Sequence, residues 1–269
     1  MSHFVKYEDI DNIRTITIDR PDRKNAINAG MLEEMCDFIK NAETNNIIRS
    51  IIITAQGDKV FSAGYDISSD SVNSKEDLLK IHLPDYQEKK HPLMKISDVI
   101  TDSSKIIIAA INGHIYGGTL EILLNCDFRF FSKESIFCMP PAKLGIVYNY
   151  YGLKNFINKI GITNTKKIFF TGNKFDANEA IDMGLVDFLS EKNTVLKDSI
   201  DFAKKISVNA PLSLASIKKS INAFEKNQEI DEKTCEEIKS SIIKTLNSND
   251  YLEGQKAFKE KRNPKFSGK

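Results

Sequence analysis

The stretch that decides the fold is "KIIIAAINGHIYGGTLEILLNC", residues 105–126. Its continuous apolar run predicts a buried strand that ends near Ile111, and the leucines of "GTLEILLNC" fall on one face of a helix. Gly117 and Gly118 stand at the turn between the two. A Gly-Gly turn leaves backbone N–H groups unobstructed, so it can receive an anion or an oxygen on which charge develops.

A second glycine turn follows another apolar strand. The isoleucines at 51–53 predict this strand, and "FSAGYDI", residues 61–67, begins soon after it. Its small residues allow a ligand to approach the backbone closely. Two backbone N–H groups that converge on one oxygen form an oxyanion hole. We therefore predict that the two glycine turns act as a pair.

The N-terminal part of the chain has predicted strands and helices, and the C-terminal part has predicted helices alone. Alternating polar and apolar residues over 5–19 predict an antiparallel hairpin, and residues 29–43 have helical periodicity. The polar residues 68–91 are expected to be a mobile segment over a site. Strand and helix alternation followed by helices alone predicts an α/β core over 1–203 and a helical oligomerisation module over 204–269.

Composition excludes several classes of protein. The chain has 269 residues, of which 41% are hydrophobic, with 38 Lys and Arg against 37 Asp and Glu. The net charge of +1 offers no general argument for nucleic-acid or membrane binding. There is no apolar run of about 18 residues, and the charged N-terminus does not resemble a signal peptide. The scattered cysteines and histidines form no metal motif. We expect a cytoplasmic protein without a bound metal.

Several motifs together resemble one family. "RKNAIN", "VFSAGYDI", "INGHIYGGTLEILLNC", "GNKFDANEAIDMGLVD" and "EGQKAFKEKRNPKF" follow the order and spacing of the crotonase (enoyl-CoA hydratase/isomerase) superfamily from about residue 4 to 266. The resemblance implies a spiral of ββα units and a C-terminal helical module that forms trimers, often paired as hexamers. It also implies a coenzyme A thioester substrate, no separate cofactor, and an oxyanion hole from the N–H groups of Tyr65 and Gly118.

The resemblance further implies a track for coenzyme A. Basic side chains suit its phosphates, although each could also belong to an ordinary solvated face. In some family members the tail residues reach the nucleotide of a neighbouring subunit. The implied substrate- and coenzyme A-binding residues are Arg23, Lys24, Ala26, Ala63, Gly64, Asp66, Ile67, Pro140, Phe258 and Lys261.

The carboxylates limit which reaction this family member could catalyse. A hydratase of the family uses two carboxylates, and Glu121 matches the first of them. The position of the second is occupied by Pro141, in "CMPPAKLG". Proline has no proton to give, so the sequence argues against water addition by the two-carboxylate route.

The neighbouring stretch favours decarboxylation. "LGIVYNYYG", residues 144–152, resembles the methylmalonyl-CoA decarboxylase branch of the family. There Tyr148 would orient the substrate carboxylate by one hydrogen bond, which gives a predicted catalytic set of Tyr65, Gly118, Tyr148 and Glu121. Tyr65 replaces a histidine of that branch and Pro140 a threonine. The acyl group is therefore open among malonyl-CoA, methylmalonyl-CoA and ethylmalonyl-CoA.

Two other functions stay open from the sequence. An enoyl-CoA isomerase, or an atypical hydratase, could use Glu121 as its single acid and base. A non-catalytic member would bind coenzyme A or RNA through its surface, although the near-neutral charge does not favour RNA. Structural alternatives also exist for the residues themselves, since Tyr148 could pack in the core and Glu121 could cap a helix.

Overall fold

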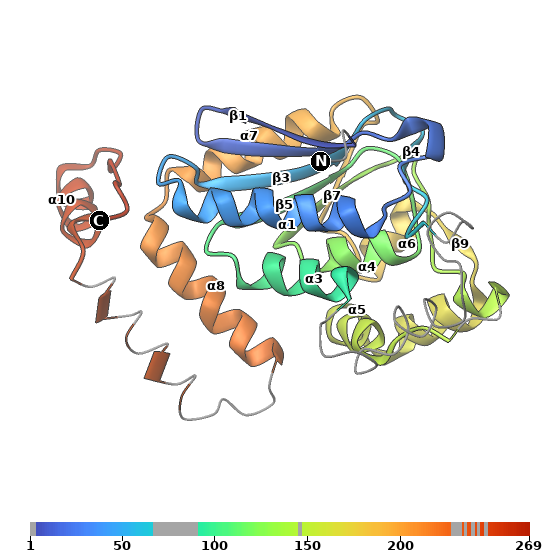
Figure 1. The fold of residues 1–269 in the computed structure, drawn as a ribbon. Coiled ribbons are helices and arrows are strands. Elements are labelled where there is room, and N and C mark those ends of the chain that lie inside the picture. Colours follow the sequence, from blue (N-terminus) through green and yellow to red (C-terminus); the bar gives the residue numbers. More distant parts are fainter. Residues whose placement is uncertain are drawn as a thin grey trace.

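The computed structural model describes residues 4–66, 91–144, 147–226 and 247–269, together with residues 233, 236, 237, 240, 243 and 244 (Figure 1). The side chains at 226, 255, 258 and 259 lie outside this description. Of the residues predicted to bind substrate, Ile67 and the side chain of Phe258 are therefore not described, and neither are residues 68–90 of the expected mobile segment.

A six-stranded sheet forms the centre of the molecule. Its first two strands pair as the predicted antiparallel hairpin, and all later pairs are parallel. In spatial order the strands are β1 (Val5–Ile10), β2 (Ile13–Ile18), β3 (Ser50–Ala55), β5 (Ile106–Ile111), β7 (Phe128–Ser132) and β10 (Phe188–Ser190). Every residue of β3 and β5 is buried, as expected for parallel strands covered on both faces.

A second, smaller sheet lies beyond the ends of the central strands. Its strands, in spatial order, are β4 (Val60–Ser62), β6 (His114–Tyr116), β8 (Phe137–Cys138) and β9 (Lys174–Phe175). The chain passes from β3 to β4, from β5 to β6 and from β7 to β8, so each turn adds a strand to both sheets. This arrangement is the predicted spiral of ββα units.

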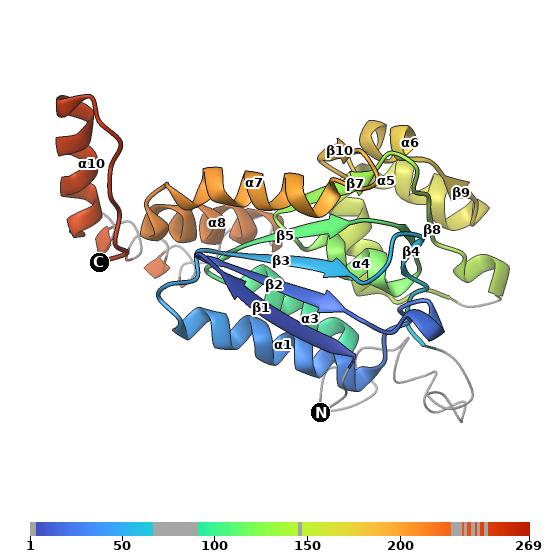
Figure 2. The ribbon, with the colours of Figure 1, turned by 90° about the horizontal axis from the view of Figure 1, so that it is seen from above.

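Helices cover both faces of the central sheet. In Figure 2, α1 and α3 lie on one side of the sheet and α7 on the other. The helices are α1 (Ala29–Thr44), α3 (Pro92–Asp102), α4 (Gly118–Leu124), α5 (Tyr150–Thr171), α6 (Ala177–Asp182), α7 (Val195–Ser207), α8 (Pro211–Lys226) and α10 (Asn249–Glu260), and the 3-10 turns are η1 (Pro21–Arg23) and η3 (Pro141–Leu144).

Most predicted elements are confirmed, and the differences concern short elements and one boundary. The strand β6 was not anticipated, because three residues are too few to show a pattern. The expected boundary after residue 203 falls inside α7, which packs on β3, β5 and β7. The division into a core and a helical oligomerisation module stays a prediction. Within residues 204–269 the structure describes the helices α8 and α10.

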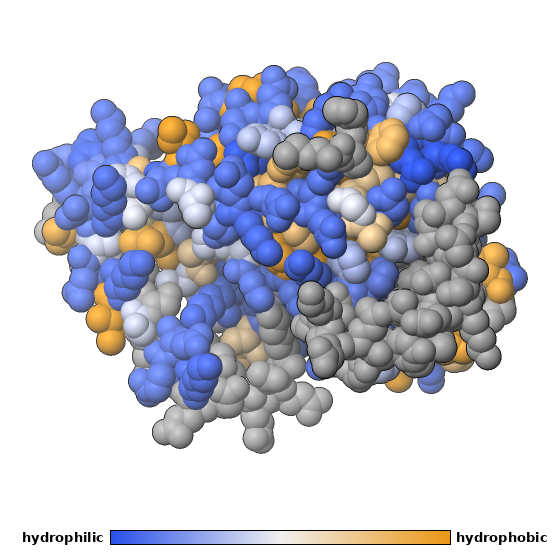
Figure 3. Space-filling model, in the orientation of Figure 1, coloured by the Kyte–Doolittle hydropathy of each residue, from blue (hydrophilic) through white to orange (hydrophobic). Residues whose placement is uncertain are grey.

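The surface is mainly hydrophilic on the face shown in Figure 3, with small separate apolar patches. One apolar row belongs to α8, where Ile217, Ile221 and Phe224 are 56%, 60% and 66% exposed. These residues are spaced to share one side of the helix. No helix in the described ranges is long and apolar enough to cross a membrane.

Candidate active site

The two glycine turns meet backbone to backbone. Gly64 has φ +99°, and a Cβ added to it would stand 2.9 Å from the carbonyl oxygen of Tyr116 and 3.4 Å from the Cα of Gly117. Gly117 itself has φ 58° and ψ −142°, a region essentially restricted to glycine. Glycine at both positions lets the two loops touch, so the two turns lie side by side.

Two buried hydroxyls link the loops. The Oγ of Ser62, at the end of β4, lies 2.8 Å from the Oγ1 of Thr119 in α4. Ser62 also donates to the carbonyl oxygen of Asn25 at 2.8 Å and accepts the N–H of Gly64 at 3.1 Å. These bonds hold the first glycine turn against the start of α4.

The backbone amides of the two turns have defined directions. The carbonyl of Gly64 accepts the N–H of Ile27, and the N–H of Asp66 donates to the carbonyl of Ile27. Because a trans peptide directs its C=O and N–H to opposite sides, the N–H of Tyr65 points away from Ile27. Gly118 is the first residue of α4, so its N–H has no acceptor within the helix.

A tyrosine and a glutamate form a hydrogen-bonded pair beside the second turn. Tyr148 donates its hydroxyl to Oε2 of Glu121, which is 2% exposed. A Cβ at Gly118 would lie 3.8 Å from the Tyr148 hydroxyl, so the pair adjoins the start of α4. Asn149 caps α5 by accepting the N–H of Gly152 at 2.7 Å, which fixes where Tyr148 enters the site.

Burial dominates the electrostatics of this pair. It raises the pKa of Glu121 from 4.5 to about 7, against the opposing effect of hydrogen bonds with the side chains of Tyr148, Asn149 and Asn155. Burial and the charge of Glu121 also raise the pKa of Tyr148 well above its ordinary value. At neutral pH the carboxyl of Glu121 is therefore divided between its protonated and ionised forms, while the phenol keeps its proton.

The first residues of the expected coenzyme A track lie together. Ala63 donates its N–H to the carbonyl of Lys24 at 2.9 Å, so the 23–26 turn runs beside the first glycine turn. Arg23 and Lys24 are exposed. Asp66 is buried and forms an ion pair of 2.8 Å with Arg20, which gives its carboxylate a structural role in the loop.

The tail residue Lys261 is not brought to this site within one chain. It follows α10, which lies at the opposite end of the molecule from β4 (Figures 1 and 2). Pro140 is partly buried and Pro141 is buried at the start of η3. Neither of these two residues has an ionisable group.

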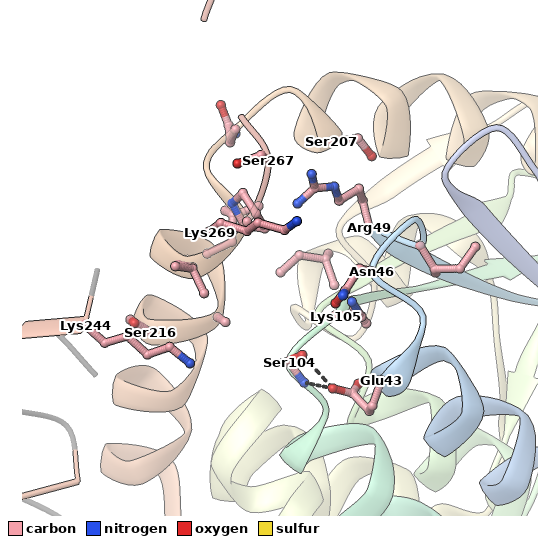
Figure 4. Close-up of a pocket in the computed structure, with 18 residues that line it drawn as sticks. Glu43, Asn46, Arg49, Ser104, Lys105, Ser207, Ser216, Lys244, Ser267 and Lys269 are labelled. Atoms are coloured by element: carbon pink, nitrogen blue, oxygen red, sulfur yellow. Dashed lines mark hydrogen bonds between the residues drawn. The ribbon is translucent and has the colours of Figure 1, made fainter. Parts of the chain in front are cut away.

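Two cavities lie away from the glycine turns. One, of about 320 Å³, is bounded by α8, the C-terminal residues and the loop before β3, and Arg49, Lys105 and Lys269 lie around it (Figure 4). The other, of about 410 Å³, lies between α7 and α8. Neither is lined by Glu121 or Tyr148. Among the residues that the structure describes, no group of three His, Cys, Asp or Glu side chains could hold a metal ion.

Comparison with known proteins identifies the family. Residues 8–269 match the model of the enoyl-CoA hydratase/isomerase family. The chain belongs to this family. The fold described above is accordingly the crotonase fold, and the protein is an acyl-CoA-processing enzyme whose substrate is expected to be an acyl-CoA thioester.

The relatives within the enoyl-CoA hydratase/isomerase family catalyse different reactions. The chain is 30% identical to carnitinyl-CoA dehydratase of Citrobacter koseri, with 99% of this chain and 98% of the relative covered. It is 27% identical to methylmalonyl-CoA decarboxylase of Escherichia coli, with 98% of each covered. An enoyl-CoA hydratase/carnithine racemase structure from Magnetospirillum magneticum has a TM-score of 0.88 at 26% identity, covering 100% of this chain and 97% of that one. The chain is thus similar over its whole length to enzymes named for different reactions on coenzyme A thioesters.

Sequence reasoning missed several residues of the site. His91 contacts Tyr65, Ser62 links the two turns, and Gly152 lies beneath Tyr148. A local signal existed for two of them. His91 precedes a proline at a helix start, and Gly152 stands three residues after the capping Asn149. Nothing local indicated the Ser62–Thr119 bond.

Proposed function

We propose that the protein decarboxylates methylmalonyl-CoA-type thioesters to propionyl-CoA-type products. The observation that carries the proposal is the buried Tyr148–Glu121 pair beside Gly118. With its pKa raised by burial to about 7, Glu121 is partly protonated at neutral pH. A protonated Glu121 does not repel a substrate carboxylate, and it can supply the proton that replaces CO2.

The proposed reaction has two steps. As the bond between the carboxylate and the α-carbon breaks, its electron pair forms an enolate and CO2 leaves. The N–H groups of Tyr65 and Gly118 stabilise the enolate oxygen. The Tyr148–Glu121 pair then protonates the α-carbon and regains its proton from water. The reaction we propose uses no cofactor, because coenzyme A is part of the substrate.

The role of Tyr148 in this proposal differs from the sequence-based expectation. Its hydroxyl donates to Glu121, so it is engaged with the carboxyl rather than available to a substrate carboxylate. We therefore assign Tyr148 to the proton-donating pair. Proline at 141 agrees with this chemistry, since decarboxylation requires no second carboxylate.

Isomerisation of enoyl-CoA is the second candidate. One buried glutamate with a pKa of about 7 also suits a base that removes a proton from one carbon and returns it to another. The ionised form of Glu121 would then be the active one, whereas the decarboxylase needs the protonated form. This difference separates the two candidates.

The proposal includes a coenzyme A track and a homotrimer, with pairing into a hexamer. The adjoining turns at 23–26 and 63–66 supply the inner part of the track, and a neighbouring subunit would supply Lys261. The exposed apolar residues Ile217, Ile221 and Phe224 of α8 support subunit contact, because a row of this kind is stabilised by burial.

The test is to incubate the purified protein with methylmalonyl-CoA and with a 3-enoyl-CoA, and to follow CO2 and thioester products by mass spectrometry. We expect propionyl-CoA, formed at least tenfold more slowly by Tyr148→Phe. The matched control is Tyr151→Phe, because Tyr151 is 47% exposed and belongs to the same segment.

Two other results of this experiment would support a different function. Turnover of the 3-enoyl-CoA alone, lost in Glu121→Gln, would replace the decarboxylase by the isomerase. If no thioester reacts, a non-catalytic protein that binds coenzyme A or RNA would be the better-supported proposal. Affinities for coenzyme A and RNA across a salt series would then decide between the ligands, because phosphate-mediated RNA binding weakens steeply with salt.

A further inference from the structure

A buried hydrogen-bond network runs from the turn at 23–26 to the start of α4. At its centre, the Oγ of Ser62 lies 2.8 Å from the carbonyl oxygen of Asn25, 3.1 Å from the nitrogen of Gly64 and 2.8 Å from Oγ1 of Thr119. Ser62 is 0% exposed, and Asn25 and Thr119 are each 1% exposed. The network therefore joins two segments that are distant in the chain, at a place that water does not reach.

The three contacts of Ser62 determine the direction of the Ser62–Thr119 bond. A serine hydroxyl has one proton to donate and two lone pairs that accept. The carbonyl of Asn25 can only accept, so it takes the proton of Ser62. The N–H of Gly64 donates to one lone pair, and the other accepts the O–H of Thr119. Thr119 thus supplies the proton of the bond that joins the two turns.

Asn25 anchors this network to the surrounding fold. Its Oδ1 accepts the N–H of Arg20 at 2.9 Å, and its Nδ2 donates to the carbonyls of Gln56 and Val60 at 3.0 and 3.1 Å. The side chain of Asn25 is therefore bonded to three backbone groups. Because Ser62 donates to the carbonyl of the same residue, its hydroxyl is held in a fixed position.

The bond from Gly64 to Ser62 limits the freedom of the first glycine turn. Glycine adopts a wider range of φ and ψ than other residues. The N–H of Gly64 donates to Ser62, and its carbonyl accepts the N–H of Ile27 at 2.9 Å. The peptide groups on both sides of Gly64 are therefore held. Without the Ser62 hydroxyl only the second would be held, and the turn could rotate.

Two contacts with opposite effects set the distance between the turns. The backbones of Gly64 and Gly117 limit how closely the turns approach, since a Cβ at Gly117 would stand only 3.7 Å from the Cα of Gly64. The Ser62–Thr119 bond limits how far they separate. Thr119 directly follows Gly118, whose amide belongs to the proposed oxyanion hole. The hydroxyl pair thus controls where this amide lies relative to the first turn.

We propose that Ser62 and Thr119 are positioning residues, which hold the two glycine turns at the spacing needed to stabilise an enolate oxygen. This inference rests on the oxyanion hole of the proposed function. Stabilisation by backbone N–H groups depends on their distance and direction from the oxygen, so a small displacement of one turn lowers the rate strongly. The two hydroxyls act through the backbone of the turns and not through contact with the substrate.

The test removes the hydroxyl of Thr119 and keeps its branched shape. Thr119→Val leaves Ser62 its bonds to Asn25 and Gly64. We expect kcat on methylmalonyl-CoA to fall about tenfold to a hundredfold and KM to change less than about threefold, because the loss falls on the enolate rather than on the bound substrate. Thr119→Ser keeps a hydroxyl and should retain the kcat of the wild type.

A spectroscopic measurement gives a readout that does not depend on which reaction the enzyme catalyses. Infrared difference spectra are recorded with propionyl-CoA isotopically labelled at the thioester carbonyl and bound at saturation. Hydrogen bonds to this carbonyl polarise it and lower its stretching frequency. We expect the wild type and Thr119→Ser to lower the frequency equally, and Thr119→Val to lower it less.

The matched control is another buried threonine. Thr54 of β3 is 3% exposed and donates to the carbonyl of Ala110 at 3.1 Å in the central sheet. Thr54→Val also removes a buried, hydrogen-bonded hydroxyl, so it should lower the thermal midpoint as Thr119→Val does. It should leave kcat and the carbonyl frequency unchanged.

Ser62→Ala tests the other end of the bond. It also removes the contacts with Asn25 and Gly64, so its effect on kcat should be at least as large as that of Thr119→Val. The double variant should lose no more than Ser62→Ala, because the two residues act through one bond. Thr119→Val carries the test alone if Ser62→Ala does not fold.

The outcomes distinguish this inference from the proposed function. Equal losses in Thr119→Val and Thr119→Ser, or in Thr119→Val and Thr54→Val, would overturn the positioning role even if the wild type decarboxylates methylmalonyl-CoA. Wild-type behaviour of Thr119→Val would overturn it as well. A smaller frequency shift in Thr119→Val alone, in an enzyme that decarboxylates nothing, would support the positioning role and reject the proposed reaction.

Discussion

Gly152 lies directly against the ring of Tyr148. A Cβ at position 152 would stand 2.5 Å from Cε1 of Tyr148 and 2.7 Å from Oε2 of Glu121. Helix α5 therefore carries glycine near its start, where any side chain would occupy the space of the Tyr148–Glu121 pair. The absence of a side chain at 152 is what allows this pair to form.

Substitution of Gly152 tests the importance of the pair for turnover. Gly152→Ala should force Tyr148 or Glu121 to move, lower kcat at least tenfold, and destabilise the fold by about 1–3 kcal/mol. Gly30→Ala is the matched control, because a Cβ there would meet only Oδ1 of Asn28 at 3.6 Å. It should keep kcat and stabilise the protein by up to about 1 kcal/mol. Equal kcat values for the two variants would contradict the assigned role.

The contact between the two turns can be tested at Gly64. Gly64→Ala combines a positive φ with a Cβ 2.9 Å from the carbonyl of Tyr116, so it should separate the turns and abolish turnover. Gly57→Ala has a similar φ of +91° but nothing within 4 Å of the new Cβ. It should cost about 1 kcal/mol of stability and leave turnover intact. Loss of turnover in both variants would point to strain rather than to the contact.

The raised pKa of Glu121 predicts how stability depends on pH. Its pKa is 4.5 in the reference state and about 7 when folded, so between these values the folded state binds more protons. The free energy of unfolding should therefore fall as pH rises from about 4.5 to 7, by roughly 3 kcal/mol. Denaturant titrations should show that this component is missing in Glu121→Gln and present in Glu33→Gln, which alters an exposed residue. A component that persists in Glu121→Gln would refute the assignment.

The pH dependence of turnover separates the two proposed reactions. A decarboxylase that needs protonated Glu121 should lose about tenfold in rate between pH 6 and pH 8, because the pKa lies near 7. An isomerase that needs ionised Glu121 should gain by a similar factor. Initial rates on each substrate across this range decide the sign. A profile that is unchanged in Glu121→Gln would show that another group titrates.

Local patterns in the sequence predicted the larger elements of the fold. Alternation over β1 and β2, the continuous apolar runs of β3 and β5, and the periodicity of α1 are confirmed. In β2, β3, β5 and α1 the pattern reflects which residues are buried, whereas in β1 only Val5 is buried. The short strands of the second sheet have no such pattern, since their pairing depends on where the larger sheet places them.

The sequence by itself also determined the residue types that make this site possible. Glycines at 64 and 118, and proline at 141 in place of a carboxylate, can be read from the chain and limit the chemistry. They limit the chemistry because the absence of a side chain at a glycine, or of an ionisable proton at a proline, does not depend on which residues lie nearby.

Only the tertiary structure decided which polar groups act together. Tyr148 meets Glu121 across 27 residues, Tyr65 meets His91 across 26, and Ser62 meets Thr119 across 57. A hydrogen bond requires two atoms to lie about 3 Å apart in a suitable direction. That distance is set by how α3, α4 and α5 pack around the two turns, and no local pattern in the sequence encodes it.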